Sequence, residues 1–502
     1  MHGVLSKSFL VHHLLLISLI IICGHEDGRE GGVDDDNKRK DIKRNGDSKN
    51  NVMLISLDSF GCKYLELLET PTLDSFKKEG VYADYVINVI PTETFPNHVS
   101  LATGLYPESH GMVSNEMYDP VFKESFKMGM TDPKWWWNDD NEPIWYTNEK
   151  NGGRSGITWW PGYNVANYTP RYMITQKMSY KEKVNQVISW LKIPKYPNLV
   201  MMHFDQLDEA GHAHGFGSQD TLREVKNIDN IIGYLLQELK NNNLLNKWNI
   251  ILTADHGMTN ISRSKIINIT DYVDPSECFV NGDGGVRFVW PKEGKKEAVY
   301  KKLKSNHHPN MQIWRKEEFP IKFHYRNHRR VSPILITVDE GWTLVNDPKQ
   351  FKFKHNGAHG YLNTYPSMLP IFFARGPGFR RAFHSKVFNL VDLYPIICKL
   401  LKIKPKPNNG TIEVTQHLLL DGNENEEFSG LLVGVMVTSV FFALGILICL
   451  VTMCLSDRKV KTVKKKNVWN DNNAMNPSEQ SKKLLLDEES DEEIEYFQSD
   501  RL

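Results

Sequence analysis

The stretch VMLISLD at residues 52–58 decides the fold class of this chain. Its first six residues are almost all apolar, and an aspartate follows them directly. A short apolar run of this kind predicts a strand that is covered on both faces, which is typical of a parallel sheet. Similar short runs at residues 199–204, 250–254 and 368–374 predict three further strands of the same buried type.

The segments between these strands carry helical patterns. A helix-forming stretch runs from the first strand to residue 76, and residues 390–401 predict a closing helix. Between the second and third strands, the apolar positions 225, 228, 232, 235 and 239 are spaced by three and four, which marks one helix face. We therefore expect an α/β fold with a mostly parallel sheet covered by helices on both faces. Residues 122–172 break the pattern with Trp, Pro, Gly and Asn, which predicts loops or a small insertion that forms a substrate wall.

Acidic and histidine residues fall where the predicted strands end. The carboxyl ends of parallel strands meet at one edge of a sheet, so we expect these side chains to lie together. A single aspartate after a strand is usually a helix cap, but caps do not explain the whole set. Three carboxylates and three imidazoles can hold two divalent cations, and mixed nitrogen and oxygen ligands suit zinc. The set comprises Asp58, Asp208, His212, Asp255, His256 and His359.

The stretch PTETFPNH at residues 91–98 contains two candidate nucleophiles, Thr92 and Thr94, just before an apparent helix. A hydroxyl at a helix N-terminus gains from the helix dipole, and a bound zinc ion lowers the pKa of a hydroxyl. The alternative interpretation is that both threonines only cap the helix.

Both ends of the chain differ in composition from its middle. An apolar run within residues 1–24 predicts a signal peptide, and the charged residues 25–50 predict a disordered leader. Residues 430–455 carry no charge and are long enough for a transmembrane helix, with a basic cluster directly after it. We therefore expect a single-pass type I protein of the plasma membrane with a catalytic domain outside, at residues 51–411. A stalk at 412–429 and a cytoplasmic tail at 456–502 complete the prediction.

Charge and cysteine content narrow the class of protein further. The 502 residues include 61 basic and 61 acidic side chains, and this balance argues against a partner that is a nucleic-acid polymer. Only Cys62, Cys278 and Cys398 lie in the predicted outer domain, so at least one is free or pairs with another chain. Asparagines in four N-glycosylation triplets fit an outside location. They are Asn167, Asn260, Asn268 and Asn409.

Several motifs together resemble the ectonucleotide pyrophosphatase/phosphodiesterase family of the alkaline phosphatase superfamily. They include PTETFPNH (91–98), TGLYPESHG (103–111), NEMYDP (115–120) and WPG (160–162). DEAGH (208–212), DHGM (255–258) and HGY (359–361) follow in the same order. The resemblance covers about residues 52–411, and the layout of the whole chain is most similar to the member 5 type.

The resemblance implies an alkaline-phosphatase-like fold, two zinc ions and a covalent threonyl intermediate. Asp208, His212 and His359 would hold one zinc ion. Asp58, Asp255, His256 and the nucleophile Thr94 would hold the other. Asn115 matches a residue that donates a hydrogen bond to a phosphate oxygen, and Phe95 matches one that stacks on the nucleobase. Trp160 and its aromatic neighbours are expected to line the substrate pocket.

Two acids depart from the family pattern, because many relatives carry Lys at the position of Glu93 and a basic or neutral residue at that of Glu116. Two acids near the phosphate site predict a preference away from highly charged nucleotides. The main expectation is hydrolysis of extracellular nucleotides to nucleoside 5′-monophosphates. A phosphodiesterase for choline esters or lysophospholipids, and an inactive adhesion domain, are the alternatives. The chain lacks the Cys-x-Pro-x-Arg type of motif that a sulfatase needs.

Overall fold

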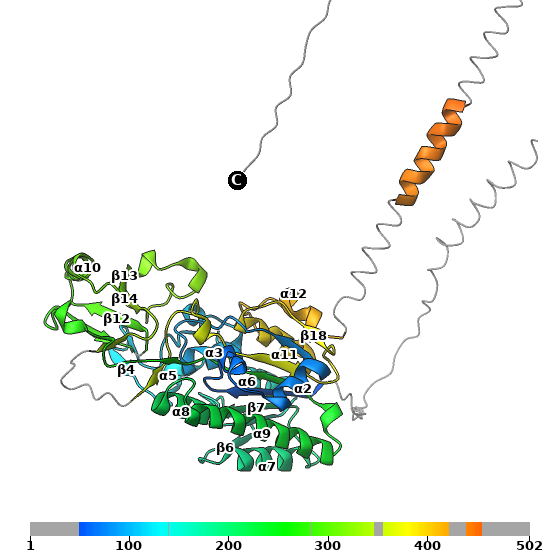
Figure 1. The fold of residues 1–502 in the computed structure, drawn as a ribbon, viewed down its shortest axis with the longest axis horizontal. Coiled ribbons are helices and arrows are strands. Elements are labelled where there is room, and N and C mark those ends of the chain that lie inside the picture. Colours follow the sequence, from blue (N-terminus) through cyan, green and yellow to red (C-terminus); the bar gives the residue numbers. More distant parts are fainter. Residues whose placement is uncertain (1–49, 139, 283, 346–354, 421–437, 454–502) are drawn as a thin grey trace, which may run out of the picture.

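A computed structural model of the chain describes residues 50–138, 140–282, 284–345, 355–420 and 438–453 (Figure 1). The predicted signal peptide, nearly all of the leader, and the cytoplasmic tail lie outside the described residues.

An eight-stranded sheet forms the centre of the domain, in the order β18-β2-β17-β8-β1-β7-β5-β6. The predicted first strand is β1 (Val52–Leu57), and it pairs in parallel with β7 (Leu199–Phe204) and β8 (Asn249–Thr253). All residues of these three strands are buried, as their apolar sequences predict. The other strands of the sheet are β2 (Val81–Ala83), β5 (Ser155–Thr158), β6 (Tyr172–Ile174), β17 (Phe372–Arg375) and β18 (Phe383–His384).

Two parts of the sheet differ from the sequence expectation. The fourth predicted strand begins at Phe372 rather than at residue 368, because residues 366–368 form a 3-10 turn, and it runs antiparallel to β8 and β2. Strand β5 lies within the stretch expected to be loops, yet it pairs in parallel with β7 and β6. Ile157 is the one large apolar residue of this strand. A Cβ on Gly156 would lie 2.9 Å from the ring of Trp190, so Trp190 packs directly on the backbone of the strand. The strand is therefore covered without a run of large apolar side chains of its own.

Helices cover both faces of the sheet, as expected. On one face, α2 (Pro71–Glu79), α7 (Tyr180–Leu191) and α9 (Gln219–Asn241) pack on alternate residues of β1. The predicted stripe on α9 is buried along its length. On the other face lie α3 (Thr94–Thr103), α6 (Ile144–Lys150) and the closing helix α11 (Leu393–Leu401). Figure 1 shows α7 and α9 along the lower side of the domain and α11 on the opposite side.

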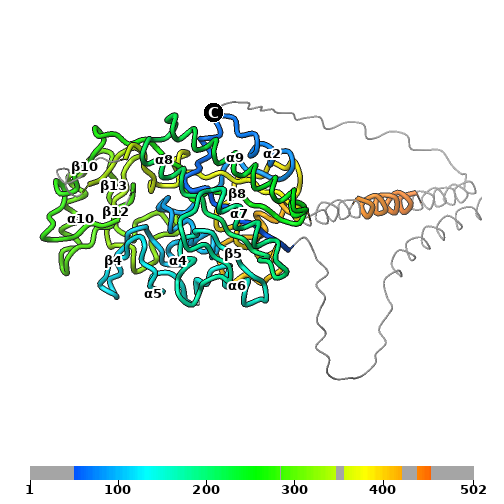
Figure 2. The backbone as a smooth tube through the Cα atoms, turned by 90° about the horizontal axis from the view of Figure 1, so that it is seen from below, coloured from blue at the N-terminus to red at the C-terminus, as the bar shows by residue number. Residues whose placement is uncertain are grey.

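A second, antiparallel sheet lies at one end of the molecule, at the left in Figure 1 and Figure 2. Its order is β11-β12-β14-β13, and α10 (Lys296–Ser305) packs on β13. This insertion has its own small core and was not predicted from the sequence. Its strands are β11 (Cys278–Asn281), β12 (Val286–Pro291), β13 (Met311–Arg315) and β14 (Ile334–Val338).

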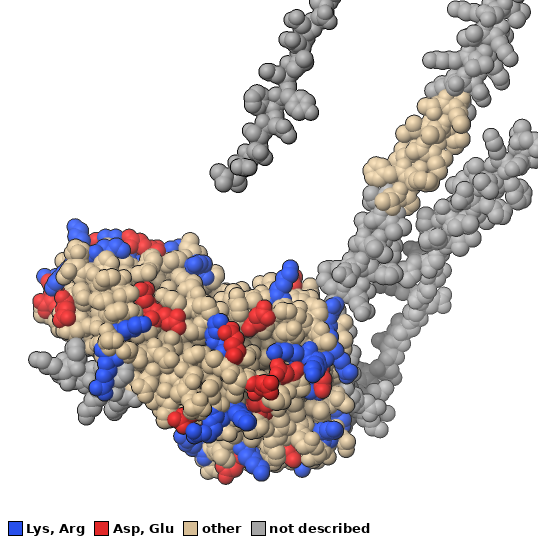
Figure 3. All heavy atoms as spheres, viewed as in Figure 1, with Lys and Arg blue, Asp and Glu red and all other residues tan. Residues whose placement is uncertain are grey.

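Short elements complete the domain. The strands are β3 (Met117–Asp119), β4 (Glu124–Phe126), β9 (Thr259–Asn260), β10 (Ile266–Asn268), β15 (Thr343–Val345) and β16 (Gly357–Ala358). The helices are α4 (Pro107–His110), α5 (Pro133–Trp136), α8 (Gln206–His214) and α12 (Ile412–Thr415). Basic and acidic side chains are mixed over the face drawn in Figure 3, which agrees with the balanced composition.

The segment after residue 411 does not begin as a free stalk. Leu418 and Leu419 are buried against the domain, and the backbone of Leu420 donates to the carbonyl of Gly378. The apolar side chains of this segment thus extend the packed domain to residue 420. Residues 438–453 are helical, but no helix of the described residues is both long enough and apolar enough to cross a membrane. Cys62, Cys278 and Cys398 are all free thiols.

Candidate active site

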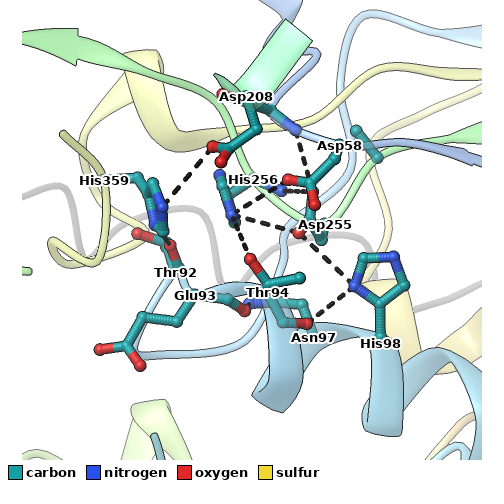
Figure 4. A network of polar contacts seen from close by, with 12 residues as sticks. Asp58, Thr92, Glu93, Thr94, Asn97, His98, Asp208, Asp255, His256 and His359 are labelled. Atoms are coloured by element: carbon teal, nitrogen blue, oxygen red, sulfur yellow. Dashed lines mark hydrogen bonds and ion pairs between the residues drawn. The ribbon is translucent and has the colours of Figure 1, made fainter. Parts of the chain in front are cut away.

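The carboxyl ends of β1, β7 and β8 bring five of the six predicted acids and histidines to one place, and His359, directly after β16, joins them (Figure 4). Asp58 follows β1, Asp255 and His256 follow β8, and α8, which begins just after β7, carries Asp208. The six side chains form two groups of three, and in each group the ligand atoms lie within 4.8 Å of one another. The structure therefore joins residues that are up to about 300 positions apart in the sequence.

The first group is Asp58, Asp255 and His256, and all three side chains are buried. His256 Nε2 lies 3.1 Å from Asp255 Oδ2 and 3.5 Å from Asp58 Oδ1. The other ring nitrogen, Nδ1, lies 3.0 Å from the carbonyl oxygen of Gly257, which leaves the Nε2 lone pair facing the carboxylates. A Cβ at Gly257 would lie 2.0 Å from the carbonyl oxygen of Ser367, so only glycine fits after this histidine.

The second group is Asp208, His212 and His359. Asp208 and His212 are four residues apart on α8 and so share one helix face. The Nε2 atoms of His212 and His359 face each other at 3.1 Å, and they lie 3.4 and 3.6 Å from the carboxylate of Asp208. Each histidine directs Nδ1 at a backbone carbonyl 3.0 Å away, that of Gly357 or that of Thr92. This arrangement orients imidazoles that bind a metal through Nε2.

The electrostatics of both groups fit a bound cation. Burial, and then the nearby carboxylates of Asp255 and Asp208, raise the pKa of Asp58 well above its usual value. Burial likewise raises the pKa of Asp208 and lowers that of His359. Among the described residues, Asp58 Oδ1, Asp208 Oδ1 and Asp255 Oδ2 have no hydrogen-bond donor, although they are fully buried. Buried carboxylate oxygens without donors are expected where a metal ion supplies the missing positive charge.

The two groups lie side by side. The rings of His256 and His359 stack with centroids 3.7 Å apart and planes only 15° from parallel. One histidine belongs to each group, so this contact holds the two candidate metal sites next to each other.

Of the two candidate nucleophiles, only Thr94 points at a metal group. It is the first residue of α3, and its Oγ1 lies 3.4 Å from His256 Nε2. The hydroxyl of Thr92 instead donates to the carbonyl of Tyr361 and accepts from the backbone of Gly360, so it is occupied within the fold. Asn97 fixes the start of α3, because its amide donates to the carbonyl of Glu93 and accepts from the backbone of Val89.

Asn115 lies beside the nucleophile and is held by Glu93. The side-chain oxygen of Asn115 accepts from the backbone of Phe95 at 2.9 Å, which turns its amide nitrogen away from that bond. Glu93 Oε2 accepts from the backbone of Asn115 at 2.6 Å and from the hydroxyl of Ser114 at 2.8 Å. Glu93 therefore acts inside the protein as well as lining a cavity next to His212 and His359.

The two predicted substrate-binding aromatics differ in position. Phe95 is half-buried and packs against Trp136 and Phe126, with centroids 5.1 and 6.1 Å away, so part of its ring can contact a ligand. Trp160 has no exposed surface, since its ring packs edge-on to His98 and its indole donates to the His98 carbonyl. The expected direct contact of Trp160 with substrate is therefore wrong, because the side chain fills the core beneath the site.

Sequence reasoning missed residues that orient the metal ligands. His203 Nε2 lies 2.8 Å from Asp58 Oδ2. His98 Nδ1 lies 2.8 Å from the carbonyl oxygen of Thr94, and Asp255 Oδ2 is farther from the same nitrogen, at 3.5 Å, so His98 packs beside this ligand and anchors the start of α3. Burial, and then the neighbouring His98, lower the pKa of His203 to about 3. The signal for His203 is a histidine inside an apolar strand, one residue before the strand ends. The sequence signal for His98 is that it lies four residues after Thr94 on the same helix.

Comparisons with known proteins agree with this geometry. The family model described as type I phosphodiesterase/nucleotide pyrophosphatase matches residues 52–362. A bis(5′-adenosyl)-triphosphatase of Xenopus laevis is 40% identical over 374 residues, covering 73% of this chain and 81% of the relative. Ectonucleotide pyrophosphatase/phosphodiesterase family member 5 of Homo sapiens is 38% identical over 376 residues, covering 73% and 78%.

Solved structures give the same result. That of human ectonucleotide pyrophosphatase/phosphodiesterase 5 matches with a TM-score of 0.71 and 36% identity, over 74% of this chain and all of the other. The murine counterpart, as an inactive variant in complex with AMP, matches with a TM-score of 0.70 and 36% identity over the same shares. With the fold, the two metal-ligand groups and the motif order all in agreement, the chain belongs to the type I phosphodiesterase/nucleotide pyrophosphatase family of enzymes.

Proposed function

We propose that this protein is a zinc-dependent enzyme of the cell surface that hydrolyses phosphodiester or pyrophosphate bonds of extracellular nucleotides and releases nucleoside 5′-monophosphates. The observation that carries the proposal is the position of Thr94 Oγ1, 3.4 Å from His256 and next to two adjoining groups of metal ligands. Asp208, His212 and His359 would hold one zinc ion, and Asp58, Asp255, His256 and Thr94 the other. Two zinc ions there would stabilise charge on the phosphate and favour the deprotonated form of a bound hydroxyl.

The residues of the chain supply the nucleophile and its surroundings. Thr94 Oγ1 attacks phosphorus, a bond from oxygen to phosphorus forms, and the bond to the leaving group breaks. A water molecule then attacks the same phosphorus, which releases the 5′-monophosphate and restores the Thr94 hydroxyl. Two in-line displacements retain the configuration at phosphorus. Because Thr94 is the first residue of α3, the positive end of the helix dipole favours negative charge on its oxygen.

Two further residues fit roles in binding. The amide of Asn115, whose oxygen is already engaged by the Phe95 backbone, is free to donate to a non-bridging phosphate oxygen. The exposed part of the Phe95 ring can stack on a nucleobase. The carboxylates of Glu93 and of the exposed Glu116 place negative charge near this position, which supports the expected preference against highly charged nucleotides.

The test is an assay of the full chain in detergent with the 4-nitrophenyl ester of thymidine 5′-monophosphate. We expect hydrolysis that a chelator abolishes and zinc restores. Thr94→Ala should lower kcat by at least about a thousandfold, because without the hydroxyl no covalent intermediate forms. Thr94→Ser keeps a hydroxyl at the same position and serves as the matched control, with much of the activity retained.

Two outcomes would contradict the proposal. Activity that survives chelation would exclude the metal mechanism, and full activity of Thr94→Ala would exclude the threonyl intermediate. Competition among ATP, ADP, NAD, dinucleoside polyphosphates and choline phosphodiesters then ranks the substrates. Tight competition by the choline esters alone would favour the lipid-directed alternative.

The proposed outside location rests on the sequence of the two ends of the chain and on the glycosylation triplets. Three of the four asparagines are exposed and Asn268 is half-buried, so the fold leaves room for glycans. A shift in mass after glycosidase treatment, together with protease accessibility of the domain on intact cells, tests this location. Protection of the domain from protease on intact cells would contradict it.

A further inference from the structure

A buried arginine joins the insertion to two segments beside the candidate active site: residues 111–119, which contain Asn115, and residues 134–136, which pack behind Phe95. Arg330 lies in the segment before β14, about 200 residues after the loops it contacts, and its side chain is only 5% exposed. Its Nε donates to Asp119 Oδ2 at 2.8 Å, and Nη1 donates to the carbonyl of Gly111, also at 2.8 Å. One guanidinium group therefore holds the two ends of the 111–119 loop, and Asn115 lies at the middle of that loop.

The same guanidinium also binds the second segment, residues 134–136, which we call the aromatic wall. Nη2 donates to the carbonyl of Lys134 at 2.9 Å and Nη1 to that of Trp135 at 3.2 Å, and the guanidinium carbon lies 4.9 Å from the centre of the Trp135 ring. The next residue, Trp136, packs on Phe95. Arg330 thus contacts the backbone of both segments that shape the site, although within the described residues its side-chain hydrogen bonds reach neither Thr94 nor any metal ligand.

We propose that Arg330 is a positioning residue, which sets the Asn115 loop and the wall behind Phe95 at the correct distance from Thr94. The inference rests on the proposed function, since it assigns Asn115 to the phosphate and Phe95 to the base. Only a planar group with several donors can bridge one carboxylate and three carbonyls at once. A lysine in its place keeps the charge but cannot make these bonds together.

Arg329 offers a matched control. It donates to the same carboxylate, with Nε 3.0 Å from Asp119 Oδ2, but its side chain is 46% exposed. Unlike Arg330, it donates no hydrogen bond to the carbonyls of the two loops within the described residues. Arg329→Lys keeps the positive charge beside Asp119 and leaves the Arg330 bonds to the two segments in place, so kcat and KM should stay within about twofold of the wild type.

The experiment compares two substrates with the full chain: the 4-nitrophenyl ester of thymidine 5′-monophosphate, and bis(4-nitrophenyl) phosphate, which has no nucleoside. For Arg330→Lys we expect kcat to fall about 10-fold to 100-fold for both, because Asn115 shifts relative to the phosphate. KM should rise for the thymidine ester only, because only that substrate uses the Phe95 wall. Asp119→Asn, which is isosteric and keeps the carbonyl contacts of Arg330, should show the same pattern to a smaller extent.

Thermal unfolding of each variant reports whether it is folded. A purely structural role would lower the amount of folded enzyme and reduce both kcat values by one factor, with both KM values unchanged, and this result would overturn the inference. Wild-type kcat and KM in Arg330→Lys would overturn it as well. A wild-type protein that hydrolyses neither ester would instead overturn the proposed function. If Arg330→Lys does not fold, Asp119→Asn decides by the same criteria.

Discussion

Replacing Glu93 by glutamine removes negative charge at the point where the nucleophile's helix meets the loop that carries Asn115. Glu93 Oε2 accepts two hydrogen bonds, from the Asn115 backbone at 2.6 Å and from the Ser114 hydroxyl at 2.8 Å, and the side chain is buried. A hydrogen bond to a charged group contributes about 1.5–3 kcal/mol, and one between neutral groups about 0.5–1.5 kcal/mol. Glu93→Gln should therefore lower the free energy of unfolding by about 2 kcal/mol, or about 1 kcal/mol per bond.

One of these two bonds fixes Asn115 itself. If the loss of this bond raises the free energy of placing Asn115 in its catalytic position by about 1 kcal/mol, kcat should fall about fivefold. Direct loss of the donor in Asn115→Ala should cost more, about 10²–10³ in kcat. Because Glu93 acts through Asn115, Glu93→Gln should have almost no further effect on kcat in the Asn115→Ala background.

The assay measures urea unfolding and the steady-state kinetics of thymidine ester hydrolysis for the two single variants and the double variant. Glu116→Gln is the control, because Glu116 is an exposed acid next to Asn115 and its loss should change stability by less than about 0.5 kcal/mol. The reasoning is refuted if Glu93→Gln keeps wild-type stability and kcat, or if it lowers kcat equally with and without Asn115.

Four further results are expected. Removal of metal with a chelator should lower the thermal midpoint as well as abolish activity, because the buried carboxylates lose their counter-charge, and added zinc should reverse both; an unchanged midpoint would contradict this. His203→Gln should weaken metal binding about 10–100-fold at the group that contains Asp58, as measured by competition with a chromophoric chelator, and equal affinity would exclude the orienting role. Burial alone raises the pKa of Asp119, but hydrogen bonds from Arg329 and Arg330 outweigh it and hold the pKa well below its usual value. The stability that this carboxylate contributes is thus present above about pH 4 and is lost as the pH falls through the lowered pKa. The free energy of unfolding should therefore drop in acid, and it should drop less in Asp119→Asn. Glu116→Lys should lower KM for ATP more than for the thymidine ester, and added salt should reduce the difference; equal changes would argue against charge repulsion.

The central sheet and the ligand set could be predicted from the sequence because both depend on local patterns. Residues 52–57 are apolar on both faces, which only a covered strand satisfies. Asp58 follows this strand directly, and Asp255 lies two residues after the end of β8. Parallel strands align their carboxyl ends, so placement in the sequence translates into placement in space. Strand β5 could not be predicted in this way, because a single large apolar residue, Ile157, does not form a recognisable strand pattern.

The roles of Glu93 and Trp160 could not be predicted in the same way. The sequence showed an acid near the phosphate site, which suggested repulsion of highly charged nucleotides, and an aromatic in a family motif, which suggested contact with substrate. Which way a side chain points depends on distant segments: Glu93 meets Ser114 and Asn115, and Trp160 is enclosed beside His98. A family motif indicates that a residue is near the site but not which of its neighbours it contacts.

By itself the sequence determined the α/β class, the buried strands that precede the ligands, and the six side chains able to hold metal. These follow from apolar periodicity and from where polar residues interrupt it, which are properties of a few neighbouring positions. The family motifs already implied that the six divide into two groups and that Thr94 is the nucleophile. Only the tertiary structure decided that the two groups adjoin through His256 and His359, that the Thr92 hydroxyl is occupied within the fold, and that Arg330 joins the segments around the site. These depend on distances of a few ångströms between segments hundreds of residues apart, which only the packed core fixes.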